Sequence, residues 1–159
     1  MPNSTDDERE LLAARLLDFL VGDTDRGLVD QWRWARFPAE DGFLWRPIAR
    51  DRDWAFMNAE GLIARIVRRS YDKVTDYGPR HSSLHSYVWQ DQGLSRRLLT
   101  GLEKAEWDAV VARVQAALTD EVLRAAVDSL PPELAAGHAD WLAMTLRERR
   151  DDLARVAAE

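Results

Sequence analysis

Apolar residues recur at helical spacing near the start of the chain. Thr5 and Glu8 have the spacing of a capping box, which predicts a helix beginning near Asp6. Gly22 can leave a helix through a left-handed conformation, so the helix is expected to end there. Its apolar stripe is expected to consist of Leu12, Leu16, Phe19 and Leu20.

The pattern changes to alternation at residues 31–37, where tryptophans recur at every second position. Such an aromatic period of two is typical of a strand. Residues 38–42 have turn composition, and residues 43–48 are expected to return as a second strand. Pro47 cannot donate a hydrogen bond to a ladder, so the predicted hairpin is small and lies at an edge.

The rest of the chain has helical periodicity. A helix is expected over residues 59–69, an irregular or partly helical piece over 70–93, and three closing helices after it. The charged run at residues 147–152 is expected to be a solvated helix face. The helix at 59–69 is expected to pack through Leu62, Ile63, Ile66 and Val67. The basic residues within and just after this helix are expected on one solvated side or, alternatively, against phosphates or an acidic partner; they are Arg65, Arg68, Arg69 and Lys73.

These elements predict a mainly α chain with one small β-hairpin, in the α+β class. We expect residues 1–159 to form a single domain or lobe. Within it, a helix–loop–hairpin over residues 10–58 precedes a helical remainder over 59–159. The tryptophans expected to lie in the core around the hairpin are Trp32, Trp34, Trp45 and Trp54.

Composition narrows the possible functions. The 159 residues are 46% hydrophobic, which is enough for a folded core, and cysteine is absent, which excludes disulfides and thiolate metal sites. A net charge of −6 argues against general nucleic-acid binding. The sequence shows no signal peptide and no transmembrane segment, so a cytoplasmic location is the default expectation.

Carboxylates concentrate at the two ends of the predicted hairpin. Asp23, Asp25 and Asp30 follow the first helix, and Asp51 and Asp53 follow the second strand. If the hairpin folds back, these side chains converge and offer the oxygen ligands that Mg²⁺ prefers. A structural or merely solvated role is the alternative. A second candidate, the pair His81 and His85, is better explained as a polar loop cluster, because no acidic residue completes a zinc site.

The order of helix, acidic loop, hairpin and second acidic segment resembles a kinase catalytic centre. Residues 17–26 (LDFLVGDTDR) resemble the catalytic loop of atypical protein-kinase-like families, namely the CotH-like, HipA-like and secretory casein-kinase-like families. Their pattern is Gly-Asn/Asp-x-Asp-Arg-His, followed three residues later by a metal-binding residue. Residues 53–56 (DWAF) resemble the Asp-Phe-Gly segment of kinases. The longer stretch, with its segments DQWRW (30–34) and RDRD (50–53), also resembles a region of uncharacterised bacterial proteins, some of them large and envelope-associated.

The resemblance implies a role for each motif residue. Asp25 would be the catalytic-loop aspartate, and Asp30 and Asp53 would bind Mg²⁺ or Mn²⁺ together with ATP. Gln31 would replace Asp30 if the register shifts by one residue. The residues implied to support the site are Asp23, Arg26 and Asp51, with Arg26 bracing the loop.

The sequence departs from the family at two points. Gly27 stands where the family has histidine, and no Gly-rich phosphate loop or strand lysine precedes the motif. The chain therefore resembles an isolated C-terminal lobe, whose partner would be a missing N-lobe or a second chain. Two hypotheses remain open: a kinase-like, Mg-dependent ATP phosphotransferase lobe that is incomplete or inactive alone, and a non-catalytic helical partner-binding domain with a vestigial acidic loop.

Overall fold

The structure is a computed structural model that describes residues 5–27, 30–40, 42–58, 61–71, 74–81, 83–90 and 92–158. Lys73, singled out in the sequence, lies outside this part. In the described part of the chain, the only strands form one antiparallel hairpin, and the other elements are helices. The predicted fold class is therefore confirmed. The elements are α1 (Thr5–Val21), β1 (Trp32–Ala39), β2 (Gly42–Ala49), α2 (Leu62–Ser70), α3 (His85–Val88), α4 (Gln92–Leu99), α5 (Lys104–Ala117), α6 (Asp120–Asp128), α7 (Pro132–Ala135) and α8 (Ala139–Ala158).

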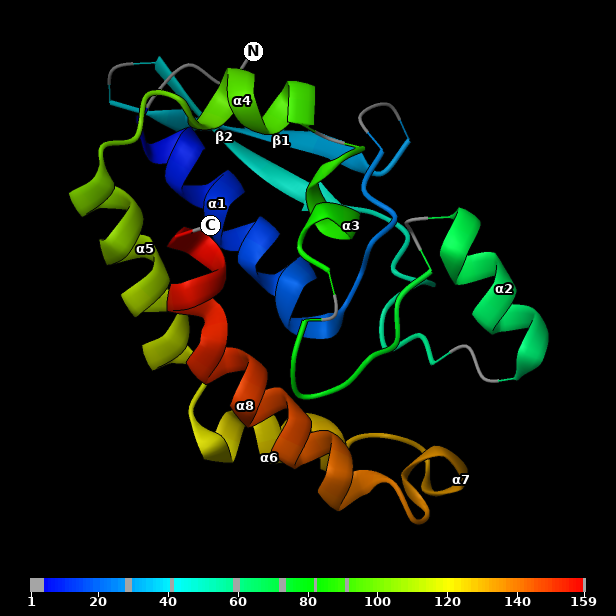
Figure 1. Ribbon diagram of the computed structural model, residues 1–159. Helices are drawn as coiled ribbons and strands as arrows, with labels where there is room; N and C mark the ends of the chain where they lie inside the picture. Colours follow the sequence, from blue (N-terminus) through cyan, green and yellow to red (C-terminus); the bar gives the residue numbers. More distant parts are fainter. Residues whose placement is uncertain are drawn as a thin grey trace.

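Helix α1 lies at the centre of the fold. It contacts the hairpin, α4, α5 and α8, and Figure 1 shows it crossing the middle of the molecule beneath the hairpin. The first turn holds the hairpin in place, because the backbone N–H of Trp45 donates to the buried carboxylate of Asp7. One core cluster lies between α1, the hairpin, α4, α5 and α8; its buried residues are Leu11, Leu12, Leu16, Trp32, Leu99, Val110, Val111, Val114 and Leu153.

The hairpin connects the two acidic segments of the sequence. Its register pairs Trp32 with Ala49 and Ala39 with Gly42, so each strand is somewhat longer than expected. Pro47 is tolerated because each strand of a two-stranded sheet has a free edge. Of the four tryptophans expected in the core, Trp32 is buried and the others are only half-buried. Because the two strands are antiparallel, the loop after α1 and the segment after β2 lie at the same end of the hairpin.

The expectation that the apolar side of α2 packs into the core is wrong. Leu62, Ile63 and Ile66 are 73%, 78% and 59% exposed, and Val67 is exposed as well. None of the described helices and strands packs extensively against α2, which projects from the side of the body in Figure 1. The periodicity predicted the helix correctly, but the apolar side of the helix is exposed and does not pack against the body of the protein.

Helix α8 also departs from expectation. The three closing helices are confirmed as α5, α6 and α8, with the short α7 between the last two. Within the run 147–152, however, Arg149 is fully buried and donates hydrogen bonds to the carbonyls of Phe19, Leu20 and Gly78. A solvated role for this residue is therefore wrong, because its guanidinium satisfies carbonyls at the end of α1.

Among the described helices, none combines the length and the apolar character that crossing a membrane requires. The irregular piece expected at 70–93 is partly helical, since it contains α3 and the beginning of α4.

Candidate functional site

The acidic loop begins where α1 ends. Gly22 has a φ of +77°, and the N–H of Asp23 then donates to the carbonyl of Asp18 at 2.9 Å. This left-handed glycine terminates the helix and turns the chain back toward it. The Asp23 side chain next accepts a hydrogen bond from the N–H of Asp25 at 3.1 Å, which shapes the loop locally.

Substitution of Gly22 by alanine is expected to destabilise the fold. A left-handed φ costs an L-residue about 1–2 kcal/mol, and a Cβ at this position would lie only 2.6 Å from Cδ2 of Tyr77, so the ring must also move. Gly27→Ala is a matched control, since that φ is ordinary and no atom of the described residues lies within 4 Å of the added carbon. Urea unfolding of both variants measures the difference, and equal stabilities would contradict this account.

Arg26 ties the loop to the segment that follows β2. Its side chain is fully buried, and one guanidinium nitrogen donates to the carbonyls of Arg50, at 2.6 Å, and Asp51, at 3.2 Å. The same guanidinium forms ion pairs with Asp23 and with Asp18, the latter at 3.1 Å. The role implied by the resemblance, bracing of the loop, agrees with these contacts.

Asp18 on α1 is the anionic centre of this network. Its buried carboxylate lies 3.0 Å from Arg15, 3.1 Å from Arg26 and 2.7 Å from Arg52. Arg15 also donates to the carbonyl of Tyr87 at 2.6 Å. Because Arg52 lies between the two aspartates of the second acidic segment, Asp18 anchors that segment to the same helix that carries the loop.

The backbone of residues 50–56 completes the connection. Arg50 donates its N–H to the carbonyl of Gln31 at 2.8 Å, and Phe56 donates to the carbonyl of Val21, also at 2.8 Å. Asp51 and Phe56 have φ values of +51° and +60°, so this segment turns sharply at both ends. The two acidic segments, separated by a whole hairpin in sequence, are therefore held side by side.

The expected site residues differ in their burial. Two of them are buried and belong to the network of arginines, whereas the others are available at or near the surface. Asp23 and Arg26 are buried, Asp25 and Gln31 are half-buried, and Asp30, Asp51 and Asp53 are exposed.

A preformed metal cage is not present. Among the described residues, no three His, Asp or Glu side chains form a group that could hold a metal ion, so Asp25, Asp30 and Asp53 do not share one coordination shell. Mg²⁺ bound to a nucleotide needs fewer protein ligands, because phosphates and waters occupy most positions of its octahedron. One or two carboxylates then suffice. Gln31 has a buried Oε1 that has no hydrogen-bond partner among the described residues. The described residues therefore do not form a protein-only metal site.

The electrostatics of Asp23 predict a pH dependence of stability. Burial raises the pKa of its carboxyl from the ordinary value of 3.8 to about 6, although Arg26 acts in the opposite direction. The folded protein then binds this proton at a higher pH than the unfolded chain does. The contribution of Asp23 to stability is therefore expected to rise as the pH falls from about 6 to about 4, and to be lost as the pH rises through that window. The measurement is the difference in unfolding free energy between the wild type and Asp23→Asn across this range; a constant difference would contradict the assignment.

His81 and His85 lie in different surroundings. His81 is buried, and its ring nitrogens lie 3.3 Å from the Asp152 carboxylate and 3.2 Å from the Phe19 carbonyl. Burial lowers the pKa of His81 to about 4, so the ring is neutral near pH 7. His85 is exposed on α3. The structure thus agrees with a polar structural role for His81 and offers nothing for zinc at this pair within the described residues.

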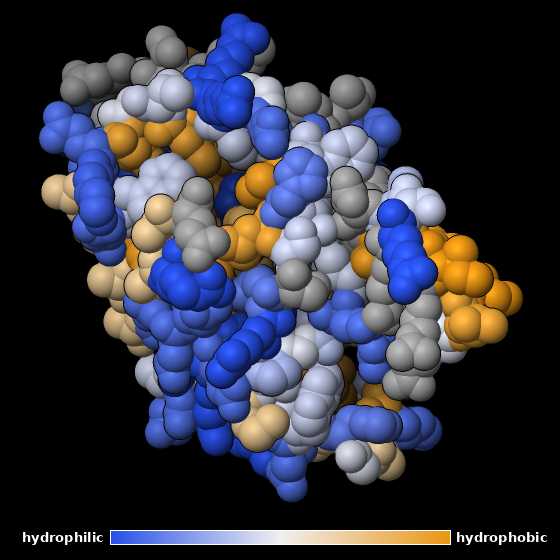
Figure 2. Space-filling model, viewed as in Figure 1, coloured by the Kyte–Doolittle hydropathy of each residue, from blue (hydrophilic) through white to orange (hydrophobic). Residues whose placement is uncertain are grey.

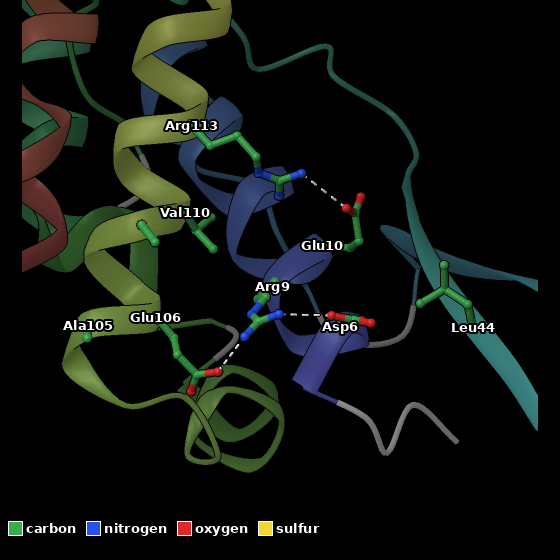
Figure 3. Close-up of a pocket in the computed structure, with 9 residues that line it drawn as sticks. Asp6, Arg9, Glu10, Leu44, Ala105, Glu106, Val110 and Arg113 are labelled. Atoms are coloured by element: carbon green, nitrogen blue, oxygen red, sulfur yellow. Dashed lines mark hydrogen bonds and ion pairs between the residues drawn. The ribbon is translucent and has the colours of Figure 1, made fainter. Parts of the chain in front are cut away.

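A separate cavity lies at the opposite end of α1. It measures about 550 Å³ and opens between the start of α1, the side of β2 and α5 (Figure 3). Arg9 pairs with Glu106 at 2.6 Å, and Arg113 pairs with Glu10 at 3.4 Å. Because carboxylates already neutralise both arginines, this cavity lacks the unpaired charge that would attract a phosphate.

Sequence reasoning missed three residues of the site network, namely Arg15, Asp18 and Arg52. A signal existed for the first two, since an Arg–Asp pair at i, i+3 falls on the otherwise apolar side of the first helix. For Arg52 the sequence offered no comparable signal, because its contact depends on how the hairpin folds back.

Comparison with known proteins yields no match: no family model, no curated protein and no solved structure is significantly similar to this chain.

Proposed function

We propose that this chain is a kinase-like phosphotransferase lobe that supplies the catalytic-loop half of a magnesium–ATP site. The supporting observation is that buried Arg26 joins the loop containing Asp25 to the backbone at Asp51. Phosphoryl transfer depends mainly on positioning and charge stabilisation, so a loop and a metal-binding segment held in fixed register are what this chemistry needs.

Each residue has a distinct role in the proposal. Asp25 orients the acceptor hydroxyl and accepts its proton, while Asp53, assisted by Asp30 or Gln31, holds the metal ion. Mg²⁺ or Mn²⁺ bound with ATP would neutralise the charge on the phosphates. The network of Asp18 and Arg26 keeps the loop rigid, a task that in the resembling families falls partly to the histidine replaced here by Gly27.

The proposal requires a partner. A Gly-rich loop covering the phosphates and a lysine contacting them cannot be assigned within these 159 residues. We therefore assign both to a second lobe outside this sequence or on another chain. We expect this chain alone to bind nucleotide weakly. Phosphoryl transfer is expected only when the second lobe is present.

The test is calorimetric titration of ATP with Mg²⁺ or Mn²⁺ into the wild type and two variants. Asp53→Asn removes a metal ligand and is expected to weaken metal-dependent binding about tenfold or more, equivalent to about 1.4 kcal/mol. Asp51→Asn tests the neighbouring carboxylate without changing the backbone, because asparagine also tolerates a left-handed φ.

Asp128→Asn is the matched control, since this aspartate is exposed on α6 and paired only with Arg124 among the described residues. Its binding should equal that of the wild type. Absence of metal-dependent binding in the wild type, or equal binding by all variants, would contradict the proposal and leave the alternative of a non-catalytic partner-binding domain.

A further inference from the structure

Helix α2 exposes a continuous apolar surface that the proposed function does not use. Leu62, Ile63, Ile66 and Val67 occupy positions i, i+1, i+4 and i+5, which place them on one side of the helix. All four are exposed, and Figure 2 shows the corresponding apolar patch at the edge of the molecule where Figure 1 places α2. Isolated apolar residues are common on protein surfaces, but a contiguous projecting patch indicates an interaction site.

The charge of α2 differs from that of the protein as a whole. The chain has a net charge of −6, yet the sequence of α2 contains three arginines and no acidic residue. Arg69 is exposed on the helix. A local cationic segment on an anionic protein is complementary to an anionic surface.

The same features favour a lipid surface over a protein groove. A short amphipathic helix of low overall hydrophobicity, whose sequence contains arginines and no acidic residue, is typical of a helix lying in a membrane interface. The patch also projects outward from the body, and no other described helix or strand packs extensively against it. A projecting helix of this kind can sink into a deformable planar surface without a shaped receptor.

We propose that α2 docks this protein on the surface of bilayers that contain anionic lipids. Its apolar side enters the boundary between headgroups and acyl chains, while the arginines meet lipid phosphates and carboxylates. The helix has nine residues and is therefore about 14 Å long, so it lies in the interface and does not cross the bilayer. Attachment through one short helix is reversible and weakens with added salt. This inference does not rest on the proposed phosphotransferase function.

The experiment is flotation of the full chain with vesicles of phosphatidylcholine alone or of phosphatidylcholine mixed with phosphatidylserine. The wild type is expected to float with the mixed vesicles, to stay behind with the neutral ones, and to be released by high salt. The double variant Ile63→Ser/Ile66→Ser should lose flotation. Because both side chains are largely exposed, this variant should keep the wild-type circular dichroism spectrum and unfolding midpoint.

The matched control is Val122→Ser/Leu134→Ser, which removes two exposed apolar side chains from α6 and α7. It should float like the wild type. Failure of the wild type to bind mixed vesicles, or equal loss in the control, would overturn the proposal. Light scattering provides a second check: a dimer that the α2 variant dissociates would show that the patch binds a second copy of this chain instead of a membrane.

Discussion

Replacing Arg26 with alanine is expected to lower the free energy of unfolding by about 3–5 kcal/mol, the usual cost of breaking a buried ion pair from one side. The substitution leaves the carboxylates of Asp18 and Asp23 facing an emptied cavity, and it removes the donors that satisfy the carbonyls of Arg50 and Asp51. Because the free energy of unfolding of such domains is only about 5–15 kcal/mol, this loss removes a large share of the stability of the fold. Chemical denaturation monitored by tryptophan fluorescence measures the effect.

A milder variant keeps this prediction testable if Arg26→Ala does not fold. Arg26→Lys retains the charge but cannot reach two carboxylates and two carbonyls at once, so hydrogen exchange at the amides of Arg50 and Phe56 should accelerate. Arg113→Ala is the control, because Arg113 is exposed and its ion pair with Glu10 is worth at most about 1 kcal/mol. Similar losses for Arg26→Ala and Arg113→Ala would show that the network does not hold the two segments together.

Replacing Arg149 with methionine is expected to cost about 3 kcal/mol. Methionine preserves much of the buried volume but donates no hydrogen bond. The carbonyls of Phe19, Leu20 and Gly78 therefore lose the hydrogen bonds that Arg149 donates. Each buried acceptor left unsatisfied costs about 1–3 kcal/mol, and the favourable charge at the C-terminal end of α1 is lost as well.

Arg147→Met separates this effect from a general change of charge on α8. Arg147 lies two residues away, is only half-buried, and pairs with Asp120 at 3.3 Å. Its loss should change stability by no more than about 1 kcal/mol. Thermal unfolding of both variants measures the contrast, and an Arg149→Met protein as stable as Arg147→Met would refute the structural role of Arg149.

Local sequence patterns predicted the elements because each pattern carries its own physical cause. The alternating tryptophans of 31–37 and the turn composition of 38–42 predicted the hairpin, which extends only slightly beyond those limits. Gly22 was correctly expected to end the first helix, since only a residue tolerant of positive φ fits there. These features depend on neighbours within a few residues, which a single sequence displays.

Features that depend on distant neighbours could not be predicted. The periodicity of α2 shows that the helix is amphipathic, but it does not show whether another element covers its apolar side. Arg149 appeared to belong to a solvated charged run, and its burial follows from α8 lying against the end of α1.

The candidate site divides in the same way. The sequence predicted which acidic segments would emerge at one end of the hairpin, and the structure places them together. The sequence did not predict that Asp23 would form a buried ion pair with Arg26. Nor did it predict that Asp30 and Asp53 would be exposed and would not share a coordination shell with Asp25. The first outcome depends on the long-range folding that buries Arg26, and the second on where the folded loop and the segment after β2 place their exposed aspartates.

The most direct test of the central claim, that the two acidic segments form one nucleotide-bound metal site, is paramagnetic broadening by Mn²⁺ and ATP in the amide spectrum of the isotope-labelled chain. The account predicts that amides of residues 23–27 and 50–56 broaden together, that ATP is required, and that Asp53→Asn abolishes the effect. Broadening at only one of the two segments, or diffuse broadening over exposed acidic helices such as α6, would contradict it.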